Sequence, residues 1–164
     1  MLSQRKKEKN NVYLILHNIR SIHNVGSVFR TADAVGVSKI FLTGYTPLPV
    51  DRFGNIRKDM SKTALGSQFT VKWESFKKIN DLINKLKKEK TEIVAIEQSP
   101  KSVDYKEFKI KNKTALIIGN EVRGISSQVL SKTDHIIEIP MKGKKESLNV
   151  SVSCGVVLFR LLDI

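Results

Sequence analysis

The sequence has little of what marks fibrous or membrane proteins. With 4 Pro and 9 Gly in 164 residues, it is neither collagen-like nor of low complexity. No run approaches the roughly 18 apolar residues that a membrane span needs, and the N-terminus has no apolar signal core. We therefore expect a cytoplasmic protein that does not enter a membrane.

Cysteine and metal-ligand patterns are scarce as well. The single cysteine, Cys154, can form neither an intramolecular disulfide nor a cysteine metal cluster, and its apolar neighbours predict a small core residue. The three histidines, His17, His23 and His135, are dispersed, and no H-E-x-x-H motif occurs. We expect no metal cofactor.

Common nucleotide-binding and hydrolase motifs are also missing. No G-x-G-x-x-G follows the first predicted strand, and no G-x-x-x-x-G-K-[ST] occurs anywhere, which disfavours ordinary dinucleotide and NTP sites. The sequence has no G-x-S-x-G, so the commonest type of α/β-hydrolase is excluded.

Charge is what the sequence has in excess. The 29 Lys and Arg against 16 Asp and Glu give a net charge of +13. A positive field of this size points to a polyanionic partner, nucleic acid first. A general bias towards lysine is the alternative explanation, and it would account for the lysines of residues 77–90 alone.

Length and hydrophobic pattern predict one α/β domain preceded by a short arm. Residues 1–10 are polar and basic and are expected to form a mobile arm, and residues 11–164 suffice for a single domain. Apolar runs of strand length alternate with helical patterns, which is typical of a mostly parallel sheet with helices on both faces. The expected strands are residues 12–16, 39–43, 69–73, 93–96, 115–118 and 136–139.

Two predicted helices border the loops that matter most. The first runs from Asn24, which suits the N-cap, to Gly36, which ends it. The last, residues 148–162, is apolar almost all round, so we expect it to be buried. Ligands of an open α/β sheet bind at the carboxyl ends of its strands, so functional groups are expected in the loops there.

Three such loops carry polar groups. In the first, Arg30 follows Asn24 by six residues near the core-facing side of the helix, although a cap and a solvated arginine would explain the pair. In the second, Gly119 and Gly124 flank Asn-Glu and could let backbone amides approach a ligand, although an ordinary strand-to-helix turn would use similar residues. The third places small polar residues at the mouth of the last helix, whose free amides favour an anionic group. These residues are Ser147, Asn149, Ser151 and Ser153.

Taken together, these stretches resemble the three signature motifs of the SpoU (TrmH-like) branch of the SPOUT RNA 2′-O-ribose methyltransferases. The residues are LHNIRSIHNVGSVFRTA at 16–32, IIGNEVRGI at 117–125, and IPM at 139–141 with SLNVSV at 147–152. Residues 45–47 and 62–66 also resemble that branch. The likeness covers the chain from Val12 onward, in the family's order and spacing.

The resemblance implies a five- or six-stranded parallel sheet, a C-terminal trefoil knot and a homodimer with active sites at its interface. It also implies S-adenosylmethionine as the methyl donor. Some members have a separate RNA-binding domain, which we do not expect here, so RNA capture is expected to depend on the dimer's own basic surface or on a partner. By position in the motifs, the cofactor would touch Ile96, Gly119, Ile139, Met141 and Leu148.

The same resemblance assigns a catalytic group: Asn24, Arg30, Glu121, Ser147 and Asn149. It puts Arg30 next to the ribose 2′-hydroxyl, where it would act either as the base or as a cationic clamp. Holding a guanidinium neutral at pH 7 costs about 8 kcal/mol, at about 1.36 kcal/mol per pKa unit. We therefore favour the clamp, which stabilises the developing alkoxide without losing a proton.

Three questions stay open at this point. The RNA substrate is either tRNA or rRNA. Methylation of a base, as in other SPOUT branches, is the alternative reaction. A non-catalytic knotted RNA-binding or assembly protein is the alternative from another functional class.

Overall fold

Seven parallel strands form one sheet in the computed structural model, which describes residues 11–164. The arm predicted at residues 1–10 lies outside the described residues. In spatial order the strands are β3 (Trp73–Phe76), β2 (Lys39–Thr43), β1 (Val12–His17), β6 (Thr114–Ile118), β4 (Glu92–Ile96), β7 (His135–Glu138) and β5 (Val103–Asp104). The predicted α/β class is confirmed. The sheet has one strand more than the upper expectation because the two-residue β5 pairs with β7.

The central strands are apolar on both faces because helices cover both faces of the sheet. In β1, Leu14 and Leu16 point into one core cluster and Ile15 into the other. Every residue of β6 is buried. This near-continuous apolar pattern is what a parallel sheet covered on both sides requires.

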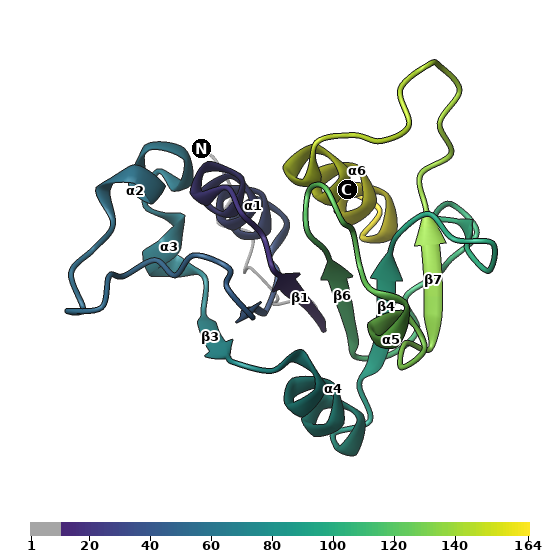
Figure 1. The fold of residues 1–164 in the computed structure, drawn as a ribbon, viewed down its shortest axis with the longest axis horizontal. Helices are drawn as coiled ribbons and strands as arrows, with labels where there is room; N and C mark the ends of the chain where they lie inside the picture. Colours follow the sequence, from purple (N-terminus) through teal and green to yellow (C-terminus); the bar gives the residue numbers. More distant parts are fainter. Residues whose placement is uncertain (1–10) are drawn as a thin grey trace, which may run out of the picture.

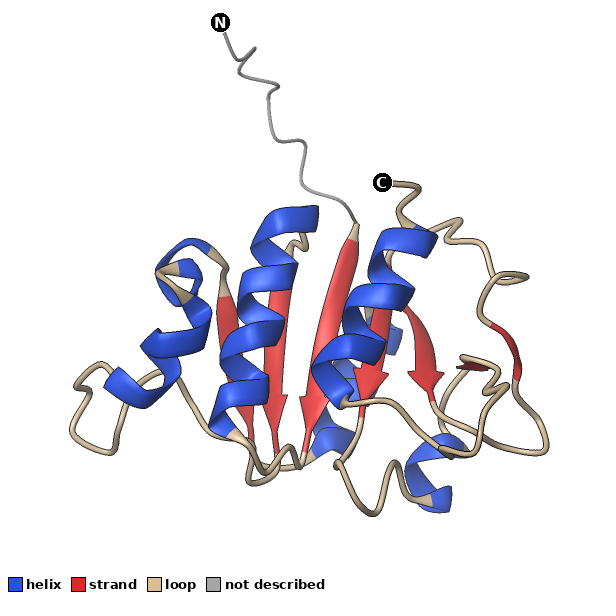
Figure 2. Cartoon of the chain, turned by 90° about the horizontal axis from the view of Figure 1, so that it is seen from above, coloured by secondary structure: helices blue, strands red, loops and turns tan. Residues whose placement is uncertain are grey.

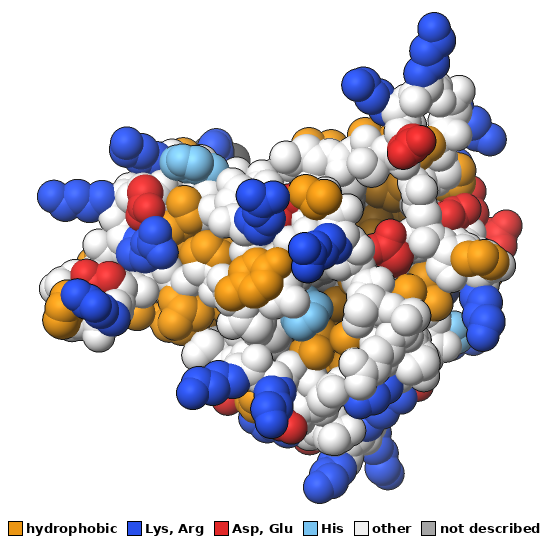
Figure 3. Space-filling view, in the orientation of Figure 1, with side chains coloured by type: hydrophobic (Ala, Val, Ile, Leu, Met, Phe, Trp, Pro, Cys, Tyr) orange, Lys and Arg blue, Asp and Glu red, His pale blue; other side chains and the backbone are white. Residues whose placement is uncertain are grey.

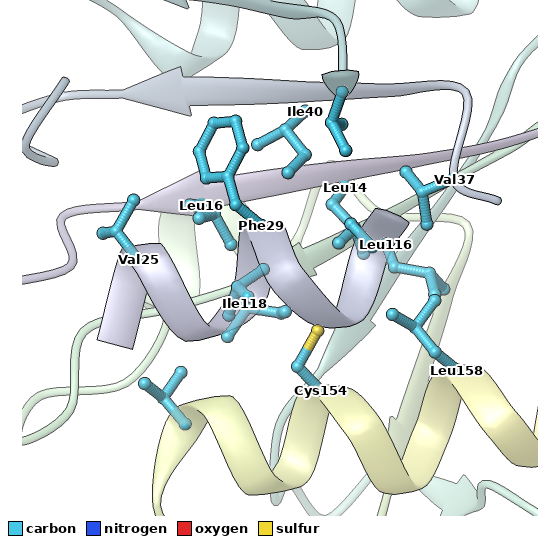
Figure 4. Packing of buried hydrophobic residues seen from close by; sticks show 14 of the residues in the cluster. Leu14, Leu16, Val25, Phe29, Val37, Ile40, Leu116, Ile118, Cys154 and Leu158 are labelled. Carbon is cyan, nitrogen blue, oxygen red and sulfur yellow. The ribbon is translucent and has the colours of Figure 1, made fainter. Parts of the chain in front are cut away.

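Six helices cover the sheet in the described part of the chain. One face is covered by α1 (Ile22–Val35), α2 (Lys58–Ala64), α3 (Ser67–Thr70) and α6 (Val150–Leu161), and the other by α4 (Ile79–Lys88) and α5 (Ser127–Leu130) (Figure 1; Figure 2). Helices α1 and α6 lie side by side, and their inner faces share a core with β1 and β6 (Figure 4). None of the helices in residues 11–164 combines the length and the apolar character that crossing a bilayer demands.

Helix α1 begins earlier than the sequence suggested. Its N-cap is Ser21, whose side chain accepts a hydrogen bond from the amide of Asn24 at 3.2 Å. The helix ends at Gly36, as expected, in the left-handed conformation that glycine adopts without strain. The cap prediction for Asn24 was wrong, and the consequence is that its side chain is free to bond elsewhere.

The prediction of an extended segment at residues 69–73 was also wrong in its boundaries. Residues Ser67–Thr70 form the short helix α3, which the amide of Val71 closes by donating to the carbonyl of Ser67 at 2.9 Å. The ring of Phe69 therefore faces solvent, and strand β3 begins only at Trp73. An apolar run of this length does not by itself distinguish a helical turn from a strand.

Helix α6 is only half buried, contrary to expectation. One stripe of α6, formed by Val150, Cys154, Val157 and Leu158, packs against the sheet and α1. On the other side, Val152, Val156 and Phe159 are 50%, 37% and 42% exposed, because no described part of the chain covers that face. Cys154 is a core residue, as predicted, and burial raises its pKa to about 12.

Candidate functional site

A cavity of about 580 Å³ opens at the carboxyl ends of β4, β6 and β7. Its walls come from the loops that follow these strands and from the segment that leads into α6. In Figure 3 it opens below the loop that protrudes at the upper right, with hydrophobic side chains in its floor. All five residues predicted to touch a cofactor line this cavity: Ile96, Gly119, Ile139, Met141 and Leu148.

Glu121 joins this cavity to the start of α1. Its carboxylate accepts hydrogen bonds from the backbone amides of Arg20 and Ser21 at 2.9 and 3.0 Å and from the Asn24 side chain at 3.2 Å. Burial acts to raise the pKa of Glu121, but these hydrogen bonds outweigh it and hold the pKa below its ordinary value. Glu121 is therefore a fixed negative charge at neutral pH, bound to the loop after β1.

Asn149 extends the same network to the last helix. Its side-chain amide donates to the Asn24 side-chain oxygen at 3.2 Å, and its own oxygen accepts from the amide of Ser151 at 2.9 Å, which caps α6. One of the free helix amides that the sequence suggested for an anionic ligand, that of Ser151, is thus already bonded to Asn149. Ser147 lies two residues earlier, exposed and on the cavity wall.

Four of the five predicted catalytic residues are thus brought together. Glu121, Ser147 and Asn149 line the cavity, and Asn24 bonds to two of them. Arg30 stands apart: it is exposed on α1 and is not among the residues that line the cavity. The expectation that it shares the core-facing side of α1 was wrong, since the core is contacted by Val28 and Phe29 while Arg30 faces solvent.

Two residues hold the site in place without having been assigned a role from the sequence. Asn120 is buried, and its side chain donates to the carbonyl of Asn18 and to the hydroxyl of Tyr45, both at 2.9 Å. Its oxygen accepts from the amides of Val122 and Arg123, which shapes the turn after β6. The only sign in the sequence that Asn120 belongs to the site was its position between Gly119 and Glu121.

The second is Glu97, which follows β4 on the cavity wall. Its carboxylate accepts from the amide of Ile125 at 2.9 Å, and a Cβ on Gly124 would lie 2.3 Å from it. Gly124 also has a φ of 64°. Likewise, a Cβ on Gly119 would lie 2.5 Å from the Ile125 side chain. Gly119 and Gly124 are therefore needed for the loop to pack closely on itself. No local sequence pattern pointed to Glu97.

The lining combines two kinds of surface. Apolar side chains from the strand ends suit a flat aromatic group, and the carboxylates of Glu97, Glu121, Glu138 and Glu146 outnumber the one guanidinium, that of Arg123. Such a lining favours a ligand with an apolar body and positive charge. Within residues 11–164, no three His, Cys, Asp or Glu side chains gather where they could hold a metal ion.

Replacing Glu121 by glutamine is expected to lower the free energy of unfolding by about 1–2 kcal/mol at pH 7, since all three donors lose a charged acceptor and at least one loses its acceptor oxygen. Because the folded pKa lies below the ordinary 4.5, the charge stabilises the fold above that value and the contribution is lost as pH falls through the lowered pKa. Urea unfolding should therefore show a difference in the free energy of unfolding between wild type and variant at pH 7, and this difference should narrow below about pH 4.

The matched control is Glu107→Gln, which removes an exposed carboxylate away from the cavity. It should unfold like the wild type at both pH values. An equal loss of unfolding free energy in both variants would show that Glu121 does not hold the two loops together. A difference between wild type and Glu121→Gln that widens in acid would show the same.

Comparison with known proteins identifies the family of this chain. The sequence model described as "SpoU rRNA Methylase family" matches residues 11–159. Over 159 residues the chain is 31% identical to the tRNA (guanosine(18)-2′-O)-methyltransferase of Escherichia coli K12, covering 97% of this chain but 65% of that protein. It is 33% identical over 145 residues to the 23S rRNA (guanosine-2′-O-)-methyltransferase RlmB of Neisseria meningitidis, covering 88% of this chain and 55% of that protein.

A solved structure of similar fold supports the same assignment. The AdoMet-bound rRNA methyltransferase from Sinorhizobium meliloti superposes with a TM-score of 0.82 at 25% identity, covering 94% of this chain and 57% of that one. The chain thus spans less than two thirds of the length of each of these three proteins. Since the family model covers nearly all of the described residues, the chain belongs to the SpoU rRNA Methylase family.

Proposed function

We propose that the chain is an S-adenosylmethionine-dependent methyltransferase that methylates a ribose 2′-hydroxyl in tRNA or rRNA in the cytoplasm. The observation that carries the proposal is the convergence of Asn24, Glu121 and Asn149, from three distant segments, on one cavity at the carboxyl ends of the strands. Relatives named as tRNA and rRNA 2′-O-methyltransferases, and the net charge of +13, support an RNA substrate.

The cavity fits the cofactor. Its apolar strand ends, Ile96, Ile139 and Leu148 among them, suit an adenine ring, and its excess of carboxylates suits a sulfonium and an amine. When bound, S-adenosylmethionine would supply the methyl group. Its presence in the superposed Sinorhizobium meliloti structure supports the same cofactor here.

The substrate oxygen must lose its proton and be held in line with the methyl group. We assign Arg30, kept charged, to clamp the target phosphate and stabilise the developing alkoxide, while the hydroxyl proton passes to solvent. Asn24 and Glu121 fix the loop after β1 against the turn after β6. Asn149 and Ser147 hold the entrance to α6, which the trefoil knot implied by the family would enclose.

A second copy of the chain would bring Arg30 into this site. The exposed stripe of α6, formed by Val152, Val156 and Phe159, offers an apolar surface of the kind that copies of a chain bury in a homodimer. Arg30 is exposed on α1 next to Thr31, and the Thr31 side chain faces α6, where it would lie 3.9 Å from a Cβ placed on Gly155. A two-fold partner seated on this stripe would receive Arg30 and supply its own.

The test is transfer of labelled methyl from S-adenosylmethionine to total RNA from cells that lack the gene. Nuclease digestion should yield a 2′-O-methylated nucleoside, and mapping the missing ribose methylations should identify the RNA. A methylated base would replace the proposal with the alternative reaction. RNA binding without incorporation of label would establish the non-catalytic alternative.

A further inference from the structure

A small, firmly built hairpin projects from the loop between β2 and α2. We call residues 50–56 the Phe53 hairpin. Val50 and Ile56 form an antiparallel bridge, and the amide of Asp51 donates to the carbonyl of Asn55 at 2.8 Å. The Asp51 side chain accepts from the amides of Phe53 and Asn55 at 2.8 and 2.9 Å. The tip therefore has a defined conformation, set by one carboxylate.

This tip presents an aromatic ring to solvent. Phe53 is 74% exposed, and the guanidinium of Arg52 lies 4.7 Å from the centre of its ring. A phenylalanine at a tight turn contributes nothing to the core, since a polar residue would serve the turn equally well. The arginine covers only part of the ring, so most of its surface stays open.

The segment that carries the ring has an excess of positive charge. Residues 50–62 contain four basic side chains, Arg52, Arg57, Lys58 and Lys62, against the two acidic ones of Asp51 and Asp59. Arg57 is paired with Asp59 at 2.8 Å, which leaves Arg52 and the two lysines to bind phosphates. The segment follows the carboxyl end of β2, so it leaves the same edge of the sheet as the cavity (Figure 2). A polyanion that reaches the cavity along this edge would meet the hairpin.

We propose that Phe53 is a stacking platform for an unpaired base of the RNA substrate, outside the nucleotide that is methylated. An exposed ring paired with arginine, in a segment with further basic side chains, is the combination by which proteins hold single-stranded RNA, the ring taking a base and the cations its phosphates. The inference rests on the proposed function, since it adds a contact for the same RNA. Charge complementarity favours this occupant over an apolar protein surface.

The experiment compares three variants of the full chain in binding total tRNA, and a ten-nucleotide single-stranded RNA alone and in duplex, by fluorescence anisotropy. Phe53→Ala should weaken binding of tRNA and of the single strand about tenfold, because a stacked base is lost. Phe53→Trp should bind at least as tightly as the wild type. The matched control, Phe69→Ala, removes a phenylalanine that is 63% exposed on α3 and should change nothing.

Binding of S-adenosylmethionine, and turnover at saturating RNA, should be unchanged in Phe53→Ala, so that only the KM for RNA rises. Unchanged RNA affinity in Phe53→Ala would overturn the inference while a methylating wild type kept the proposed function intact. A change of oligomeric state in sedimentation would assign the ring to a contact between copies and overturn it too. A wild type that neither binds nor methylates RNA would reject the proposed function, and this inference with it.

Discussion

Replacing Arg30 by alanine is expected to reduce methyl transfer at least about 100-fold, the loss typical when one group that stabilises a developing oxyanion is removed. The affinity for S-adenosylmethionine should stay within a few fold of the wild type, because Arg30 is not among the residues that line the cavity. Single-turnover rates with saturating RNA, together with calorimetric titration of the cofactor, measure the two quantities.

Arg30→Lys separates the two roles considered for this residue. Lysine keeps the charge but not the planar pair of donors, so a clamp predicts a rate between those of the wild type and the alanine variant. Preserved turnover in Arg30→Ala would remove Arg30 from the mechanism altogether.

The second large effect is expected at the exposed stripe of α6. Val156→Glu puts a charge at the middle of the surface that we propose a second copy covers, where Val156 is 37% exposed. Burying an unpaired charge is costly, so the variant should sediment as a monomer at micromolar concentration. Methyl transfer should fall about as far as in Arg30→Ala, since each site would lose the arginine of its partner.

The control is Val103→Glu, the same change at a valine that is 44% exposed in β5. It should leave both sedimentation and rate unchanged. Mixing Arg30→Ala with Asn149→Ala provides a second measurement: exchange of subunits should restore about a quarter of the wild-type activity, because one site in each mixed dimer is intact. A mixture as inactive as its components would show that Arg30 and Asn149 act within one chain.

The features of the fold that the sequence predicted well are those governed by local pattern. Continuous apolar runs such as residues 115–118 require cover on both faces, and the ending of α1 at Gly36 follows from the conformational freedom of glycine. The family resemblance predicted that Ile96 and Met141 contact one cofactor, and both line the cavity, because parallel strands end at one edge of the sheet.

The features that could not be predicted depend on partners distant in the sequence. Asn24 was interpreted as a helix cap because its bonds to Glu121 and Asn149, 97 and 125 residues away, leave no local signal. The apolar stripe of α6 looked like core because composition does not distinguish apolar residues that the chain buries from apolar residues that it leaves exposed. The trefoil knot and the roles of the individual site residues stay predictions.

The hydrogen bonds around Glu121 also set an order of events in folding. Arg20, Ser21 and Asn24 are synthesised early, Glu121 follows some hundred residues later, and Asn149 later still. A nascent chain that still has α6 inside the ribosome can build most of the sheet but lacks the wall and the capping asparagine that complete the cavity. Competence for the proposed chemistry would thus arise abruptly, once α6 has left the ribosome and docks beside α1.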